Sequence, residues 1–201
     1  ALPLSFSKTV EYLKENNLID GTVTYGQAFG GDIEAVNIYT ALISAFEILH
    51  SDVAVVAMGP GITGTGTEYG FSGIEQGPII DAVNNLGGLP IFIPRISFAD
   101  KRKRHCGISH HSITVLNKVA MSSANIVVPK FSGNKFDYIQ KQIDENTLNQ
   151  KHKIIYVDEL EKLTQDLLSF DFKLSTMGRG IDKDAEFFIT AAAAGYYASS
   201  I

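Results

Sequence analysis

The residues best suited to chemistry gather in residues 95–112, RISFADKRKRHCGISHHS, which hold three of the five histidines in the chain. Guanidinium groups bind phosphate or carboxylate through paired hydrogen bonds, and an imidazole can hold a proton or a metal ion near neutral pH. We therefore predict that arginines of this segment bind an anion and that its histidines act as general acid or base. The residues concerned are Arg95, Arg102, Arg104, His105, His110 and His111.

Two alternatives stand beside this prediction. Ser109 or Ser112 could cap a helix that follows, which would give His110 and His111 a purely structural place at its start. A divalent metal ion is the other alternative partner of the histidines. The chain contains neither HExxH nor CxxC, and His105 and His110 are not four residues apart, so no familiar ligand spacing supports a metal.

A glycine-rich loop, residues 58–73, reads MGPGITGTGTEYGFSG and contains six glycines. Backbone N–H groups of such a loop, placed between a strand and a helix, attract phosphate or carboxylate. The letters match a GxGxxG fingerprint, but the helix is expected only from about residue 72, too late for a dinucleotide site. The alternative is a surface loop whose glycines only permit turns; loops of this length are uncommon and are often functional. The predicted anion ligands are Gly59, Gly61, Thr63, Gly64, Thr65 and Gly66.

Three further charged residues follow predicted strands or turns. Asp32 and Glu34, in GQAFGGDIE, are candidates for a catalytic partner of a histidine or for a cation ligand, although an aspartate here is commonly a helix N-cap. Arg179, in TMGRG, is a candidate anion ligand, with an ion pair to Asp182 or Asp184 as the alternative.

These residues need a scaffold, and the hydrophobic pattern predicts one of alternating strands and helices. Strands are expected at residues 22–25, 52–58, 89–96, 125–131 and 153–157. Helices are expected at residues 4–16, 33–50, 74–86, 113–123, 136–149, 159–169 and 184–199. Alternation of this kind predicts a three-layer α/β/α sandwich around a mostly parallel, Rossmann-like sheet.

In a parallel sheet the carboxyl ends of all strands meet at one edge, where ligands bind. The histidine segment and the glycine-rich loop both follow predicted strands, so we expect them at that edge. The length of 201 residues predicts a single α/β domain over 1–201.

Composition excludes several classes of protein. Hydrophobic residues make up 45% and charged residues 19%, as in globular proteins. The net charge of −5 gives no overall attraction to nucleic acid, and KRKRH alone is too short to predict such a partner. No apolar run approaches the roughly 20 residues of a membrane helix, and one cysteine allows no internal disulfide. We predict a cytoplasmic protein with a small anionic ligand, no membrane partner and a homodimeric state.

Four motifs in the same order, GQAFGGDIEAVN, GPGITGTGTEYGFSG, RISFADKRKRHCGISHHS and TMGRG, together resemble an uncharacterised bacterial family known only as a domain of unknown function. The resemblance covers nearly the whole chain. It implies longer relatives, whose amino-terminal portion this chain lacks, and it implies no reaction or catalytic residue.

The residues themselves favour an enzyme, of the hydrolase or transferase class, that acts on a small phosphorylated or otherwise anionic metabolite such as a nucleotide. The alternative is a non-catalytic ligand-binding or regulatory module that uses the same pocket. Only the enzyme forms a product.

Overall fold

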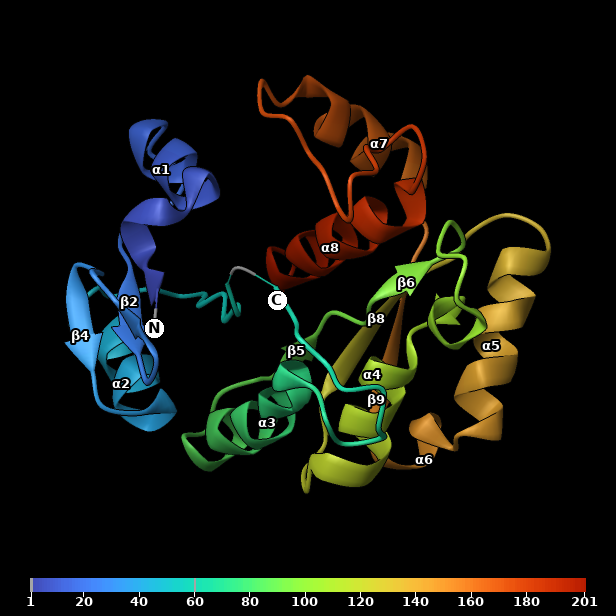
Figure 1. The fold of residues 1–201 in the computed structure, drawn as a ribbon, viewed down its shortest axis with the longest axis horizontal. Coiled ribbons are helices and arrows are strands. Elements are labelled where there is room, and N and C mark those ends of the chain that lie inside the picture. Colours follow the sequence, from blue (N-terminus) through green and yellow to red (C-terminus); the bar gives the residue numbers. More distant parts are fainter. Residues whose placement is uncertain (1, 60) are drawn as a thin grey trace. The chain divides into compact units, whose positions relative to one another are not determined.

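The computed structural model describes residues 2–59 and 61–201. By its internal contacts the chain divides into an N-terminal unit, Ala1–Thr65, and a C-terminal unit, Gly66–Ile201 (Figure 1). Both units contain helices and short sheets, and three of the four sheets in the described chain are parallel. The predicted α/β class is confirmed at this level, and the single domain stays a prediction.

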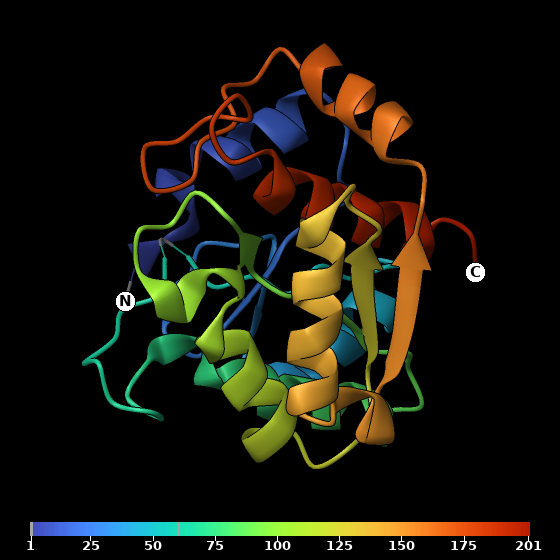
Figure 2. The same ribbon diagram turned by 90° about the vertical axis from the view of Figure 1, so that its right-hand side faces the viewer.

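The C-terminal unit is built on three parallel strands in the order β5-β8-β9. They are β5 (Ile91–Phe92), β8 (Asn125–Pro129) and β9 (Lys153–Val157), and Figure 2 shows β8 and β9 side by side. All five residues of β8 are buried, as expected for a parallel strand that is covered on both faces. The strands predicted at 125–131 and 153–157 are thereby confirmed.

The predicted strand 89–96 is broken in two. Its last part becomes β6 (Ile96–Ser97), which pairs antiparallel with β7 (Gly107–Ile108). The prediction of one continuous strand was wrong because Pro94, which has no backbone N–H to donate to a ladder, stands between the two pieces.

Helices predicted at 74–86, 136–149, 159–169 and 184–199 are present with shifted ends, whereas the one predicted at 113–123 starts earlier, at His110, and ends at Val119. The longest helix of the described chain, α8, has 14 residues, and none is long and apolar enough to cross a membrane. The helices of the C-terminal unit are η2 (Ser72–Glu75), α3 (Gln76–Asn85), η3 (Lys103–His105), α4 (His110–Thr114), a π-helical turn η4 (Val115–Val119), α5 (Asn134–Glu145), α6 (Leu148–Lys151), α7 (Leu160–Ser169) and α8 (Ala185–Ala198).

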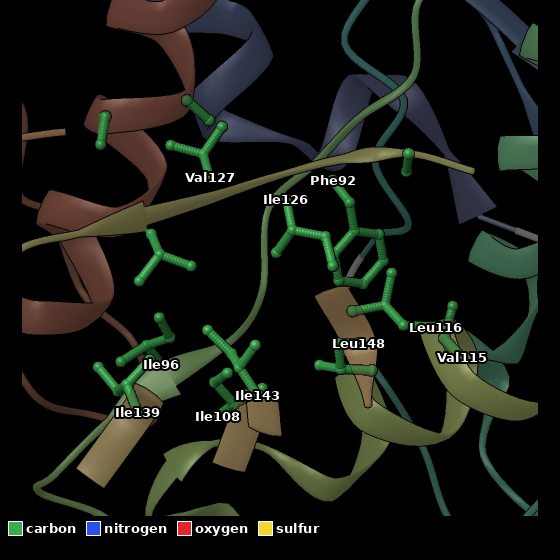
Figure 3. Packing of buried hydrophobic residues seen from close by; sticks show 14 of the residues in the cluster. Phe92, Ile96, Ile108, Val115, Leu116, Ile126, Val127, Ile139, Ile143 and Leu148 are labelled. Atoms are coloured by element: carbon green, nitrogen blue, oxygen red, sulfur yellow. The ribbon is translucent and has the colours of Figure 1, made fainter. Parts of the chain in front are cut away.

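The hydrophobic core lies in the C-terminal unit and uses both faces of β8. In Figure 3, Val127 points toward α8, while Ile126 points to the opposite side, where Leu116, Ile143 and Leu148 pack. These side chains are almost completely buried, and each such burial stabilises a fold by about 1.5–3 kcal/mol.

The N-terminal unit has two small parallel sheets. One pairs β1 (Leu2–Pro3) with β3 (Ala28–Phe29), and the other pairs β2 (Val23–Tyr25) with β4 (Ile33–Ala35). The helix predicted at 4–16 appears as η1 (Leu4–Phe6) and α1 (Lys8–Glu15). Ser7 caps α1 by accepting a hydrogen bond from the Val10 N–H, at 3.3 Å.

The helix predicted at 33–50 was wrong in its first part. Residues 33–35 form β4, and the helix α2 (Ile38–Glu47) begins later because Asn37 and Thr40 form a capping box. The Asn37 side chain accepts from the Thr40 N–H at 3.1 Å, and the Thr40 hydroxyl accepts from the Asn37 N–H at 3.2 Å.

The strand predicted at 52–58 was also wrong. These residues form no strand, and Val53 and Val55 are 55% and 83% exposed. The apolar run suggested a buried parallel strand, but in the described part of the chain no strand pairs with it.

Candidate functional site

The histidine segment is held in place by hydrogen bonds between its two ends and by one side chain of α5. The Ser109 N–H donates to the Arg95 carbonyl at 2.8 Å, and the Arg95 N–H donates to the Ser112 hydroxyl at 3.0 Å. Gln142 of α5 accepts from the Ile108 N–H at 2.8 Å and donates to the Cys106 carbonyl at 3.2 Å. The segment begins at Arg95, three residues after β5 ends, so its start lies near the carboxyl end of that strand.

Gly107 makes the close approach to α5 possible. Its φ is +66°, a conformation that residues with a side chain rarely adopt. A Cβ at this position would lie 2.3 Å from the Gln142 Oε1 and 2.7 Å from the Tyr138 ring. The glycine thus lets the backbone between His105 and His110 lie against α5.

The three imidazoles of His105, His110 and His111 meet in one cluster. Ring centroids lie 4.9 Å apart for His105 and His110, 5.1 Å for His105 and His111, and 4.2 Å for His110 and His111. One ring nitrogen from each histidine lies within 4.8 Å of the other two. The sequence prediction that these residues act together is compatible with this placement.

Each ring has its own surroundings. His105 is buried, and its Nδ1 lies 2.8 Å from the Ser109 hydroxyl. His111 stacks on Phe71 with ring centroids 4.1 Å apart. The His110 Nε2 is buried and has no hydrogen-bond partner among the described residues. Ser109 is also the N-cap of α4, since its side chain accepts from the His111 N–H at 3.3 Å, so one structural alternative from the sequence is confirmed.

The environment keeps these imidazoles neutral at pH 7. Burial, reinforced by nearby arginines and by the neighbouring His110, lowers the pKa of His105 and of His111 to about 4. Burial and the charges of Arg104 and Arg102 also lower the pKa of His110. At neutral pH the rings therefore offer nitrogen lone pairs, and they do not carry the extra proton of a general acid.

Two of the predicted anion-binding arginines are engaged within the protein. Asp100 lies between Arg95 and Arg102, with ion-pair distances of 3.2 Å and 2.9 Å. The hydrogen bond from Arg102 holds the pKa of the Asp100 carboxyl well below its usual range, against the effect of burial. Arg104, in contrast, forms no ion pair with any described residue, and its Nε lies 3.4 Å from the His105 Nε2.

A hollow of about 430 Å³ adjoins the cluster within the C-terminal unit. Gly66, with a φ of +84°, lies with Thr67 and Glu68 in the middle of the glycine-rich loop and lines the hollow. The cation of Lys118 is paired with Glu68, so Arg104 supplies the positive charge in the hollow that no carboxylate of the described chain neutralises. The lining includes Gly66, Thr67, Glu68, Arg104, His110, Thr114, Asn117 and Lys118.

Several lining residues were not predicted from the sequence. Thr114 and Asn117 lie four and seven residues after His110, a spacing that places side chains on one face of a helix. Starting the predicted helix at His110 would have revealed them. Thr67 and Lys118 belong to segments 51 residues apart, and no local pattern connects them.

The remaining predicted ligands of the glycine-rich loop lie in the N-terminal unit, as do Asp32 and Glu34. Their part in a common site stays a prediction. The predicted loop ligands in the N-terminal unit are Gly59, Gly61, Thr63, Gly64 and Thr65.

Asp32 and Glu34 both make hydrogen bonds within the N-terminal unit. Asp32 accepts hydrogen bonds from Lys14 at 2.6 Å and from the Thr22 hydroxyl at 2.7 Å, which lower its pKa to about 2. Glu34 accepts from the Gly30 N–H at 2.5 Å. Asp32 does not cap α2, so that alternative was wrong.

Arg179 is tied to a buried carboxylate. Its Nε donates to Asp184 at 3.0 Å, and Asp184 also accepts from the Ser97 hydroxyl at 2.7 Å. The ion pair with Asp184, one of the alternatives raised by the sequence, is confirmed.

Comparison with known proteins agrees with the resemblance carried by the four motifs. Residues 1–195 match the model of the family DUF3866, which is described as a protein of unknown function. No curated protein and no solved structure has significant similarity to the chain. The match covers almost the entire sequence, and the chain therefore belongs to the DUF3866 family.

Proposed function

We propose that the protein is an enzyme that acts on a small phosphorylated or otherwise anionic metabolite bound in the hollow beside α4. The observation that carries this proposal is Arg104, a guanidinium group without a carboxylate partner among the described residues that lines the hollow together with His110. Such a group binds phosphate or carboxylate bidentately.

The size and place of the hollow support the same conclusion. Its volume of about 430 Å³ lies within the range of small-molecule sites. The histidine segment starts three residues after β5 ends, and ligands bind at the carboxyl ends of strands in open parallel sheets. We propose that the sheet is Rossmann-like and that this edge is its active edge.

A hydrolase or transferase fits the groups that line the hollow. Transfer of a phosphoryl or acyl group needs a cation beside the oxygen that gains negative charge, and it needs a group that activates the nucleophile. Arg104 supplies the cation, and the neutral imidazoles supply lone pairs for the activation. A nucleotide is one metabolite that this chemistry accommodates.

The test is a thermal-shift screen of the full chain with inorganic phosphate, nucleotides and sugar phosphates, followed by mass spectrometry of the stabilising compound. We expect Arg104→Gln to weaken binding about 10- to 100-fold, because a hydrogen bond to a charged group contributes about 1.5–3 kcal/mol. Lys103→Gln is the matched control, since it removes the same charge from a neighbouring residue that does not line the hollow.

Three outcomes count against the proposal. The anion site is wrong if no anion stabilises the chain, or if both substitutions weaken binding equally. Binding without product would instead indicate the non-catalytic ligand-binding module.

A further inference from the structure

The histidine cluster has a geometry that the anion site does not explain. Each of the three rings offers a nitrogen atom, and these atoms lie within 4.8 Å of one another. Catalytic zinc sites use three protein ligands at about 2.0–2.1 Å and leave a fourth position open. Nitrogens on such a tetrahedron are about 3.4 Å apart, so rotation of the rings would bring the three atoms into range. We propose that His105, His110 and His111 bind one divalent transition-metal ion of the Zn²⁺ type.

The unpaired nitrogen of His110 is the second observation. Its Nε2 is buried and makes no hydrogen bond with any residue that the structure describes. Buried polar atoms are normally paired, because an unpaired one costs about 1–3 kcal/mol. A metal ion would use this lone pair. The ion therefore accounts for an atom that is otherwise left without a partner.

Ser109 provides the support that a metal-binding histidine needs. Histidine ligands usually hydrogen-bond through the ring nitrogen that does not hold the metal, which fixes the orientation of the ring. The Ser109 hydroxyl lies 2.8 Å from the His105 Nδ1 and leaves Nε2 as the nitrogen available to an ion. The Arg104 Nε, 3.4 Å from that Nε2, would move aside on binding.

The type of ligand atom and the surrounding charges indicate which metal ion the site would bind. Imidazole nitrogens favour zinc, cobalt, nickel and copper, whereas magnesium and calcium prefer oxygen. Among the described residues one carboxylate, Asp100, pairs with Arg95 and Arg102, and it leaves the charge of Arg104 uncompensated. A cation is stable in such a setting when an anion fills its open position, and His110 places the ion at the wall of the proposed anion site. Binding of the ion does not rest on the proposed function, but its catalytic use does; the bound ion would then take the activating role that the free imidazole lone pairs have in that proposal.

The test uses the full chain after removal of metals with a chelator. We expect one Co²⁺ per chain, with the intense visible absorption of a four-coordinate ion, and displacement of that ion by Zn²⁺. His110→Gln and His111→Gln should each weaken Co²⁺ binding by more than about 100-fold, because even the loss of an outer partner costs 10- to 100-fold. Ser109→Ala should weaken it by about tenfold.

His50→Asn is the control for incidental binding by histidine. His50 has a φ of +51°, which asparagine tolerates, and it lies outside the cluster. We expect this variant to bind Co²⁺ like the wild type. The wild type itself gives a measurement that needs no substitution: Zn²⁺ should raise its unfolding temperature, whereas Mg²⁺ should not.

The two proposals fail in different ways. Arg104→Gln should lose anion binding and keep Co²⁺, while His110→Gln should lose Co²⁺. The metal site is overturned if the wild type binds Co²⁺ no more tightly than the doubly substituted His110→Gln, His111→Gln chain. It is also overturned if the absorption is that of a six-coordinate ion, and neither result affects anion binding that depends on Arg104.

Discussion

His152 and His110 belong to the same unit, but their ring nitrogens differ in hydrogen bonding. His152 is buried, its Nε2 lies 2.9 Å from the Leu116 carbonyl, and its Nδ1 accepts from the Ala124 N–H at 3.1 Å. Both ring nitrogens of His152 thus form hydrogen bonds with backbone groups. The buried Nε2 of His110 has no such bond, and His110 lines a hollow. The difference separates a histidine that holds the fold together from one that retains capacity for a ligand.

The largest expected effect is on the stability of the fold. We predict that His152→Ala lowers the free energy of unfolding by about 2–5 kcal/mol, because it leaves a cavity and a buried Ala124 N–H without an acceptor. The Leu116 carbonyl keeps a partner in Lys151, at 3.1 Å. His110→Ala should cost less than about 2 kcal/mol, because no hydrogen bond of its Nε2 is lost.

Urea unfolding followed by circular dichroism measures both variants. His152→Asn preserves an acceptor near the Nδ1 position and should recover part of the loss. If His152→Ala and His110→Ala lower the free energy of unfolding equally, the unpaired Nε2 of His110 does not distinguish the two residues.

The second prediction concerns the backbone that carries the cluster. Gly107 and Gly87 have similar φ values, +66° and +77°, but a Cβ on Gly107 would collide with Gln142 and Tyr138, whereas none is near Gly87. Gly87→Ala should therefore cost only the conformational strain, about 1–2 kcal/mol. Gly107→Ala should cost roughly 1–3 kcal/mol more, because the site becomes overpacked.

The same pair of variants tests whether α5 positions the histidines. Gly107→Ala should also weaken Co²⁺ binding, and Gly87→Ala should not. If both alanines lower stability by the same amount, the close packing of Gly107 against α5 is unimportant.

Local sequence signals located the histidine segment and much of the C-terminal unit. The strands β8 and β9 are built around β-branched apolar residues, which favour a strand on local evidence alone. The cluster of His105, His110 and His111 was found because its residues lie within seven positions of one another. In both cases the decisive information is local.

The errors arose where a distant residue decides the outcome. Asp32 has the local context of a helix cap, but Lys14 and Thr22 bind its carboxylate, and Asn37 caps α2 instead. The hollow joins the loop at Thr67 to a helix face at Asn117, a combination that depends on packing. The unpaired His110 nitrogen also depends on packing, which no spacing in the sequence reveals.

The third prediction uses pH to separate the contribution of His152. Burial lowers its pKa below the usual 6.5, so the unfolded chain takes up a proton near pH 6.5 while the folded chain does not. The free energy of unfolding should therefore fall as the pH drops below 6.5, until the folded-state pKa is passed. The free energy of unfolding of His152→Asn should fall less steeply with decreasing pH than that of the wild type, when both are measured with a chelator between pH 7 and 5. Identical slopes would exclude the burial effect at this residue.

The smallest expected effect on stability concerns Asp32, a carboxylate that is hydrogen-bonded through both oxygens but is exposed to solvent. The Asp32 side chain is 44% exposed, and its bonds to Lys14 and Thr22 lower its pKa from 3.8 to about 2. Its stabilising contribution is present above pH 3.8 and is lost as the pH falls through 2. Asp32→Asn should remove this contribution, but solvent screening keeps it small. Urea unfolding at pH 6 and pH 2.5 tests this, with Asp166→Asn as the control for the loss of an exposed negative charge. If Asp32→Asn lowered the free energy of unfolding at pH 6 as much as His152→Ala does, hydrogen bonding would matter more for stability than burial.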